Sequence, residues 1–279
     1  MEADTQLVPA VPLAPSRRER EAEADTDARR TVPPVLQPRP GGIAERFANL
    51  VGPENPVRVF VVALLTSYAL LVTAMVFLGL ALIDVVLPTA NLDDDDERVS
   101  QWLADHRTPD QEHLSWIGST FAGGLVIPVV IGLCLLVFVI KRRWVLAAFV
   151  LFAVALESGT YRATSLIVER NRPDVQRLEG LPVDASYPSG HTAASIALYG
   201  GLLLLLCSRI RNRAVWIAAL LVGIAIPLFV GWARTYRGMH HVTDVGAGVL
   251  MGVAVLALIV FVARATEAAA RNRDKGRAT

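Results

Sequence analysis

Residues 188–191 read Pro-Ser-Gly-His and lie where a polar loop runs into a long apolar segment. We expect a helix to begin there, because Pro188 fits the first helical turn and lacks the N–H that this turn would leave unpaired. Ser189 and Gly190 would then present free backbone N–H groups at the positive end of the helix dipole, which favours an anion. His191 adds a side chain that gains or loses a proton near neutral pH. The motif predicts an anion site with an acid–base group beside it.

Two further segments carry groups suited to the same anion. Arg172 precedes a proline in the loop before this motif, and Arg234 lies near the end of a later apolar segment. Arginine binds phosphate through a planar fork that stays charged. His240 and Asp244 are four residues apart, which predicts that they share one face of a helix. A carboxylate there would orient the imidazole, although the pair His240-His241 can also be purely structural.

Together these groups fit phosphoryl transfer, which needs fixed donors, an in-line nucleophile and a proton for the leaving oxygen. We expect His240, oriented by Asp244, to be the nucleophile. We expect His191 to protonate the departing alcohol and then to activate water against the phosphohistidine. The groups expected to bind the phosphate are Arg172, Ser189, Gly190 and Arg234.

The order and spacing of these motifs resemble the type 2 phosphatidic acid phosphatases, whose site is shared with vanadium haloperoxidases and glucose-6-phosphatase. The family pattern is Lys-x6-Arg-Pro, then Pro-Ser-Gly-His, then Ser-Arg-x5-His-x3-Asp. The residues named above match it, and the likeness extends over residues 58–264. It implies a six-span helical bundle and catalysis without a metal ion or other cofactor.

Two positions depart from that pattern. Ser165 stands where the family has lysine, and Ala233 stands where it has serine. The first change removes a cation that would bind phosphate, and Arg162, Arg170 or Arg237 could supply the charge instead. The second change removes only a hydroxyl group.

The composition predicts a protein that spans a membrane. Hydrophobic residues make up 53% of the 279 residues and charged residues only 19%, which is below the usual quarter of a soluble domain. The apolar residues fall in six runs near the ~20 residues needed to span a bilayer. These runs are 58–83, 118–140, 144–167, 191–209, 213–233 and 242–264.

The fold class expected is therefore all-α, a bundle of six transmembrane helices within residues 51–265. Glu157 lies inside the third run and needs a partner there, either Arg162 or a contact between helices. Cys134 and Cys207 both lie in apolar runs and are expected to be buried hydrophobic residues.

Both ends of the chain are expected to lie in the cytoplasm. Residues 1–50 are rich in proline and charge, which predicts a disordered tail, and their composition does not suggest a signal peptide. Residues 266–279 form the other tail. Between the first two runs, 93–97 is acidic, and we expect a solvated loop there, although it could bind a divalent cation. The spacing of apolar residues after it predicts a short helix on the membrane surface.

Arginine and lysine in short loops set the orientation. The basic loops at 141–143 and 209–213 and the basic end of the chain fall on one side, which is then cytoplasmic. The three motifs fall on the outer side, where Arg170, Arg172, Arg234 and Arg237 exceed the usual arginine content. A bound anion would account for them.

These features predict a plasma-membrane phosphatase that acts at the outer face on a phosphatidic acid-like or polyprenyl lipid phosphate or diphosphate. Membrane lipids and the substrate are the expected partners. The net charge of +1 suggests no nucleic acid partner, and no partner protein can be inferred. Two alternatives remain. One is a different reaction at the same site, either transfer of the phosphoryl group to an acceptor other than water or halide oxidation. The other is a non-catalytic relative.

Overall fold

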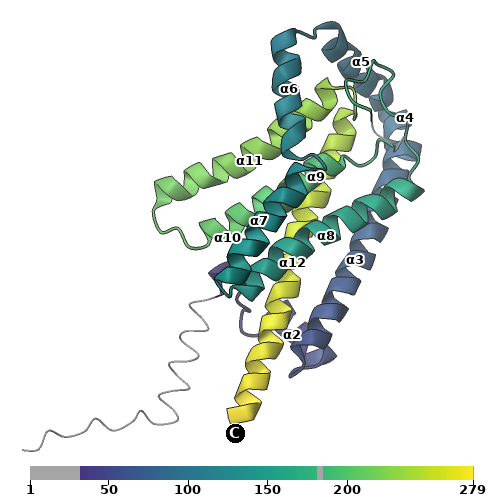
Figure 1. The fold of residues 1–279 in the computed structure, drawn as a ribbon. Helices are drawn as coiled ribbons and strands as arrows, with labels where there is room; N and C mark the ends of the chain where they lie inside the picture. The colour runs from purple at the N-terminus through teal and green to yellow at the C-terminus, as the bar shows by residue number, and fades with distance from the viewer. Residues whose placement is uncertain (1–31, 181–184, 279) are drawn as a thin grey trace, which may run out of the picture.

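A computed structural model describes residues 32–180 and 185–278, and within these ranges the chain is helical and has no strand (Figure 1). The helices are η1 (Pro34–Leu36), α2 (Ile43–Val51), α3 (Pro56–Ala81), η2 (Leu82–Val86), α4 (Leu87–Ala90), α5 (Leu92–Asp105), α6 (Pro109–Phe121), α7 (Val126–Ile140), α8 (Trp144–Ile167), α9 (Gly190–Ser195), η3 (Ile196–Gly200), α10 (Gly201–Cys207), α11 (Arg213–Tyr236) and α12 (Val242–Ala278). Here η1 is a 3-10 helix, and η2 and η3 are π-helical segments that join the helices around them.

The expected bundle of membrane helices is confirmed. Five stretches are long and apolar enough to cross a membrane, and α6 with α7 would make a sixth. The two helices of that pair meet at an angle of 43°, so the second span is broken. The break falls at Gly123 and Gly124, which have low helix propensity.

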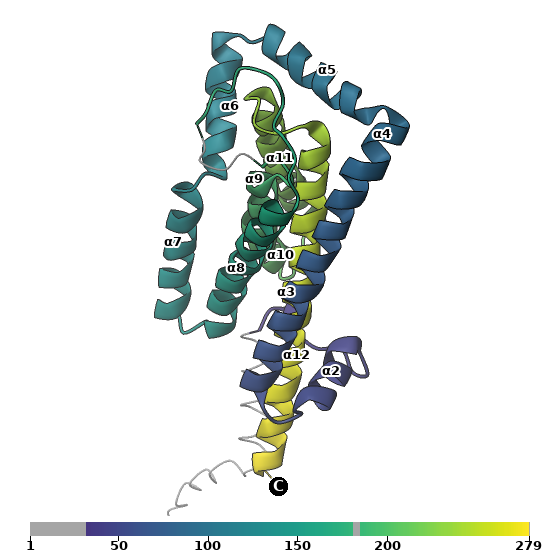
Figure 2. The same cartoon turned by 90° about the vertical axis from the view of Figure 1, so that its right-hand side faces the viewer.

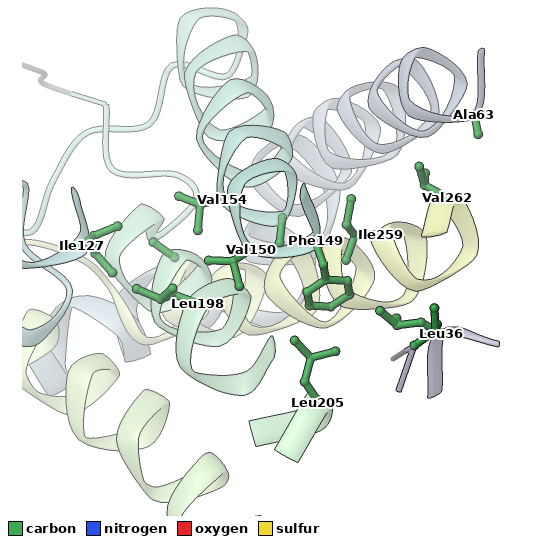
Figure 3. Close-up of a cluster of buried hydrophobic side chains, with 13 residues drawn as sticks. Leu36, Ala63, Ile127, Phe149, Val150, Val154, Leu198, Leu205, Ile259 and Val262 are labelled. Atoms are coloured by element: carbon green, nitrogen blue, oxygen red, sulfur yellow. The ribbon is translucent and has the colours of Figure 1, made fainter. Parts of the chain in front are cut away.

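Helix α12 lies at the centre and contacts α2, α3, α8 and α9. Its side chains Ile259 and Val262 pack with Phe149 of α8, Leu198 of η3 and Leu36 of η1 (Figure 3). Large apolar side chains on the outer faces of the helices remain exposed, as expected for surfaces that face lipid.

Small residues let α9 and η3 lie close against α12. A Cβ atom added to Gly252 would lie 2.7 Å from the Cβ of Ile196, and one added to Gly248 would lie 2.5 Å from the carbonyl oxygen of Ser189. Both distances are too short for a side chain. The glycines of α12 therefore fix the depth at which the Pro-Ser-Gly-His segment sits on this helix.

The first fifty residues are more ordered than expected where the structure describes them. Residues 43–51 form α2, whose Ala44 and Ala48 pack against Ala265 and Ala268 of α12 (Figure 2). The expected disorder of residues 1–31 lies outside the described residues. At the other end, α12 continues as a helix to Ala278.

The acidic run departs from the expected solvated loop. Its aspartates lie in the first turns of α5, where negative charge is favoured by the helix dipole. Asp96 is buried, with only 5% of its surface exposed, whereas Asp93, Asp94 and Asp95 are exposed. The predicted short helix after the run is part of α5, and Trp102 on it is exposed. Across the described ranges, no three carboxylate, histidine or cysteine side chains are placed to hold a metal ion.

Candidate active site

The three motifs meet at the end of the bundle that carries α5 (Figure 2). The loop after α8 supplies Arg172, the start of α9 supplies His191, and the end of α11 supplies Arg234. His240 and Asp244 come from the turn before α12 and from its first residues. Antiparallel helices thus gather side chains that lie as many as 72 residues apart in the sequence.

Arg234 is fully buried at 0% exposure. Its Nη1 donates hydrogen bonds to Ser119 Oγ at 2.6 Å and to Glu179 Oε2 at 2.5 Å. Its Nε and Nη2 atoms are buried and have no hydrogen-bond partner among the described residues. Because a buried unpaired donor is costly, these two N–H groups are suited to an anion such as phosphate.

Glu179 is a site residue that the sequence did not reveal. Its carboxylate also accepts a hydrogen bond from Nε of Arg237 at 2.5 Å, so it bridges two arginines. Burial alone would raise the pKa of Glu179, but the positive charges of Arg234 and Arg237 lower it to about 2. The carboxylate is therefore ionised and occupies one edge of the Arg234 guanidinium.

Arg172 is buried near Arg234, as expected. Its Nη1 donates to the carbonyl oxygen of Met239 in the turn before α12. Burial lowers the pKa of Arg172, and the neighbouring charge of Arg234 lowers it further. Two buried guanidinium groups that repel one another favour the binding of an anion between them.

His240 does not lie on a helix with Asp244, since α12 begins at Val242. The Nδ1 atom of His240 lies 2.7 Å from the carbonyl oxygen of Ser186. A carbonyl oxygen only accepts, so Nδ1 carries the proton and Nε2 keeps its lone pair. Burial lowers the pKa of His240 well below its usual range, and the charges of Arg234 and Arg172 lower it further, outweighing Asp244. The imidazole is thus neutral, as a nucleophile must be.

Asp244 reaches His240 through an intermediate residue, not directly. Its Oδ2 accepts from Ser186 Oγ at 2.5 Å and from the backbone N–H of His241 at 2.9 Å. Its Oδ1 accepts from Nη1 of Arg170 at 2.6 Å. The imidazole is therefore oriented by the carbonyl group of Ser186, and Asp244 acts on it by holding Ser186.

The Pro-Ser-Gly-His segment is placed as expected with one correction. Helix α9 begins at Gly190 with Ser189 as its N-cap, so Pro188 precedes the helix and is not its first residue. The backbone N–H of Ser189 is not free, because it donates to the carbonyl oxygen of Asp244 at 3.0 Å. His191 is partly exposed at the first turn of α9.

The comparisons with known proteins cover the part of the chain that carries the site. Residues 144–267 match the family described as the PAP2 superfamily. The part of the chain that carries the expected site is therefore similar to this family. The matched segment contains all seven residues expected from the sequence to form the site.

One curated relative and one solved structure extend the match. An undecaprenyl-diphosphatase of Sulfolobus acidocaldarius is 33% identical over 123 residues, which are 42% of this chain and 54% of the relative. The chain thus matches about half the length of that protein. A transmembrane PAP2-type phosphatidylglycerolphosphate phosphatase of Bacillus subtilis shares the fold, with a TM-score of 0.55, 22% identity and coverage of 71% of this chain and 92% of the other.

The two departures from the PAP2 pattern are buried and are not compensated by the arginines proposed above. Ser165 donates from Oγ to the carbonyl oxygen of Arg162 at 3.2 Å, and the Arg162 side chain is exposed. Arg170 binds carboxylates, and Arg237 binds Glu179. A Cβ atom on Gly118 would lie 2.8 Å from the Cβ of Ala233, so this part of α11 packs tightly against α6.

Glu157 is not paired with the exposed Arg162. It is buried in α8, and its Oε2 accepts a hydrogen bond from Oγ of the adjacent Ser158 at 2.9 Å. The contact that satisfies it is therefore local to its own helix.

Proposed function

We propose that this protein is an integral-membrane phosphatase that hydrolyses a lipid phosphate or diphosphate through a phosphohistidine at His240. The observation that carries the proposal is the pair of buried, unpartnered N–H groups of Arg234 beside a neutral imidazole. Donors fixed in advance stabilise the charge that develops on phosphoryl oxygens during transfer. Arg172 and the backbone N–H of Gly190 complete the phosphate site, with Ser189 as the N-cap of α9.

In the first step, Nε2 of His240 forms a bond to phosphorus and the bond to the leaving oxygen breaks. The proton stays on Nδ1 and keeps its hydrogen bond to the Ser186 carbonyl oxygen, which stabilises the positive charge of the ring. His191 gives its proton to the leaving oxygen. In the second step, His191 takes a proton from water, whose oxygen attacks phosphorus, and the bond from phosphorus to Nε2 breaks.

Two observations support a lipid as the substrate. The site lies at one end of a bundle of membrane helices, where a headgroup at the interface could reach it. The curated relative is an undecaprenyl-diphosphatase, and we propose a polyprenyl diphosphate or a phosphatidic acid-like lipid here. The basic loops on the opposite side suggest that the site faces outwards.

The test is phosphate release by the full chain, purified in detergent, from undecaprenyl diphosphate and from phosphatidylglycerol phosphate. We expect release of inorganic phosphate from at least one of them, in the presence of a metal chelator and with no acceptor other than water. The His191→Ala variant should be about a hundredfold slower or worse. Absence of phosphate release from a panel of lipid phosphates would contradict the proposal, and an acceptor-dependent product would indicate a phosphotransferase.

A further inference from the structure

The acidic helix α5 contacts the active site through a buried side chain. Oδ2 of Asp96 accepts a hydrogen bond from Nη2 of Arg170 at 2.9 Å, and its other oxygen accepts the backbone N–H of Thr243 at 3.2 Å. The hydroxyl group of Thr243 donates to the same carboxylate. Among the contacts of the described residues, Asp96 is thus the one residue of α5 that binds both the loop after α8 and the first residues of α12.

Arg170 connects Asp96 to the residues that orient the nucleophile. Its second terminal nitrogen, Nη1, donates to Oδ1 of Asp244, and its backbone carbonyl group accepts the N–H of Ser186 at 2.8 Å. Ser186 in turn donates to Asp244 and accepts from Nδ1 of His240. Arg170 therefore holds Ser186 in two ways, directly through its backbone carbonyl group and indirectly through Asp244.

We propose that Asp96 is a positioning residue of this site, acting through Arg170, Asp244 and Ser186 on the imidazole of His240; this rests on the proposed function of His240. The guanidinium group of Arg170 is a rigid fork. With one prong bound to Asp96, the other prong is directed at Asp244. Without Asp96, the fork can rotate and the Asp244–Ser186 unit loses its support.

The charges of this network also act on His240. Arg170 lies between two buried carboxylates, Asp96 and Asp244, and the exposed Asp93 lies 3.7 Å from its Nη2. On the other side of the network, His241 contacts both Asp244 and Glu97. Removal of the Asp96 charge leaves the positive charge of Arg170 less neutralised. That change disfavours the charge that His240 gains when it forms a bond to phosphorus.

A second attachment of α5 supports the assignment. Oε1 of Glu97 accepts the backbone N–H of Asp174 at 3.1 Å, and the Gln101 amide group donates to the Asp174 carbonyl oxygen at 2.7 Å. Asp174 follows the Arg172-Pro173 pair directly. The helix thus holds the same loop at two points, and the Asp96 contact leads through Arg170 to the residues that orient the nucleophile.

The test compares Asp96→Asn with Asp94→Asn in the full chain. Both variants remove one negative charge from the same helix turn, but Asp94 is exposed. The number of active sites is measured as the orthovanadate bound at saturation, and kcat is expressed per active site. Orthovanadate, a phosphate analogue, reports on the phosphate site through its inhibition constant.

We expect Asp96→Asn to lower kcat per active site about tenfold or more, because a misplaced nucleophile loses its alignment with phosphorus. We expect KM and the vanadate inhibition constant to stay within about twofold, because Arg172 and Arg234 are untouched. Asp96→Glu, which keeps the charge, should recover part of kcat. Asp94→Asn should match the wild type.

An Asp96→Asn variant with kcat per active site equal to that of the wild type would overturn the inference, even if less protein folds. If Asp96→Asn does not fold, Asp96→Glu decides: a kcat per active site unchanged from the wild type overturns the inference, and a loss confined to kcat supports it. A wild-type protein that releases no phosphate from lipid phosphates would instead overturn the proposed function.

Discussion

At the scale of single residues, the site combines a neutral imidazole with buried positive charge. The residue types and spacing of Arg172, His191, Arg234, His240 and Asp244 predicted that these side chains would meet. Their pairing could not be predicted, because it depends on where α12 begins. The helix starts two residues after His240, so the imidazole turns to the carbonyl group of a residue in a different loop.

The low pKa of His240 leads to a prediction about pH. In the free enzyme, His240 is neutral above its lowered pKa and loses nucleophilicity only when the pH falls below it. The acid limb of kcat/KM should therefore lie well below 6.5, once the ionisation of the substrate is divided out. An acid limb at pH 6.5 or above would mean that the imidazole is charged in the resting site.

Glu179 leads to a prediction about anion binding. The Glu179→Gln variant removes a negative charge that occupies one edge of Arg234, so orthovanadate should bind roughly tenfold more tightly. Without an anion, the buried Arg234 loses its carboxylate partner, and the thermal unfolding temperature should fall. Saturating vanadate should restore more of this temperature in the variant than in the wild type. Weaker vanadate binding by Glu179→Gln would show that the carboxylate supports the phosphate site.

The same loop offers a control variant for the Glu179 experiment. Asp174→Asn removes a charge from an exposed side chain, while the backbone contacts of Asp174 to α5 remain. We expect this variant to bind vanadate as the wild type does. A similar gain in both variants would indicate a general effect of loop charge.

At the scale of elements, helices α5, α9 and α12 determine the geometry of the site. The apolar runs predicted the long helices, since their length and hydropathy depend on the bilayer and not on the neighbours. The buried role of α5 and the packing of α2 could not be predicted. Five consecutive acidic residues are usually solvated, and the difference between Asp96 and Asp94 depends on Arg170, which is 74 residues away from Asp96.

The position of α9 leads to a prediction about Gly190. A Cβ atom there would lie 2.9 Å from Cδ2 of the Tyr161 ring on α8, so Gly190→Ala must displace the start of α9. We expect a loss of kcat/KM of about tenfold or more from misplacement of His191 and the Gly190 N–H. Gly246→Ala is the matched control, because nothing lies within 4 Å of its added Cβ atom. Equal activity in Gly190→Ala and Gly246→Ala would show that α9 has room to move.

At the scale of the whole molecule, the end of the bundle that carries the site lies opposite the end that carries the basic loops. The site, α5 and the loop after α8 lie at one end, and the C-terminus of α12 lies at the other (Figure 2). The segments that span the membrane followed from composition, apart from the break between α6 and α7. The orientation follows from the positive-inside rule and remains a prediction.

Cysteine labelling in intact cells tests the orientation. In a variant with Cys134 and Cys207 replaced by alanine, a cysteine at the exposed Asp94 should react with a membrane-impermeant maleimide. A cysteine at the exposed Arg211, in the basic loop after α10, should react only after the cells are permeabilised. The reverse pattern would place the site in the cytoplasm.

The central claim is that His240 carries the phosphoryl group. The most direct measurement is mass spectrometry of the protein after rapid mixing with a lipid phosphate and an alkaline quench, which preserves phosphohistidine. We predict that His240 carries one added phosphoryl group in the wild type and that His240→Ala carries none. Steady turnover with no phosphorylated His240 at any mixing time, or full activity in His240→Ala, would contradict the account.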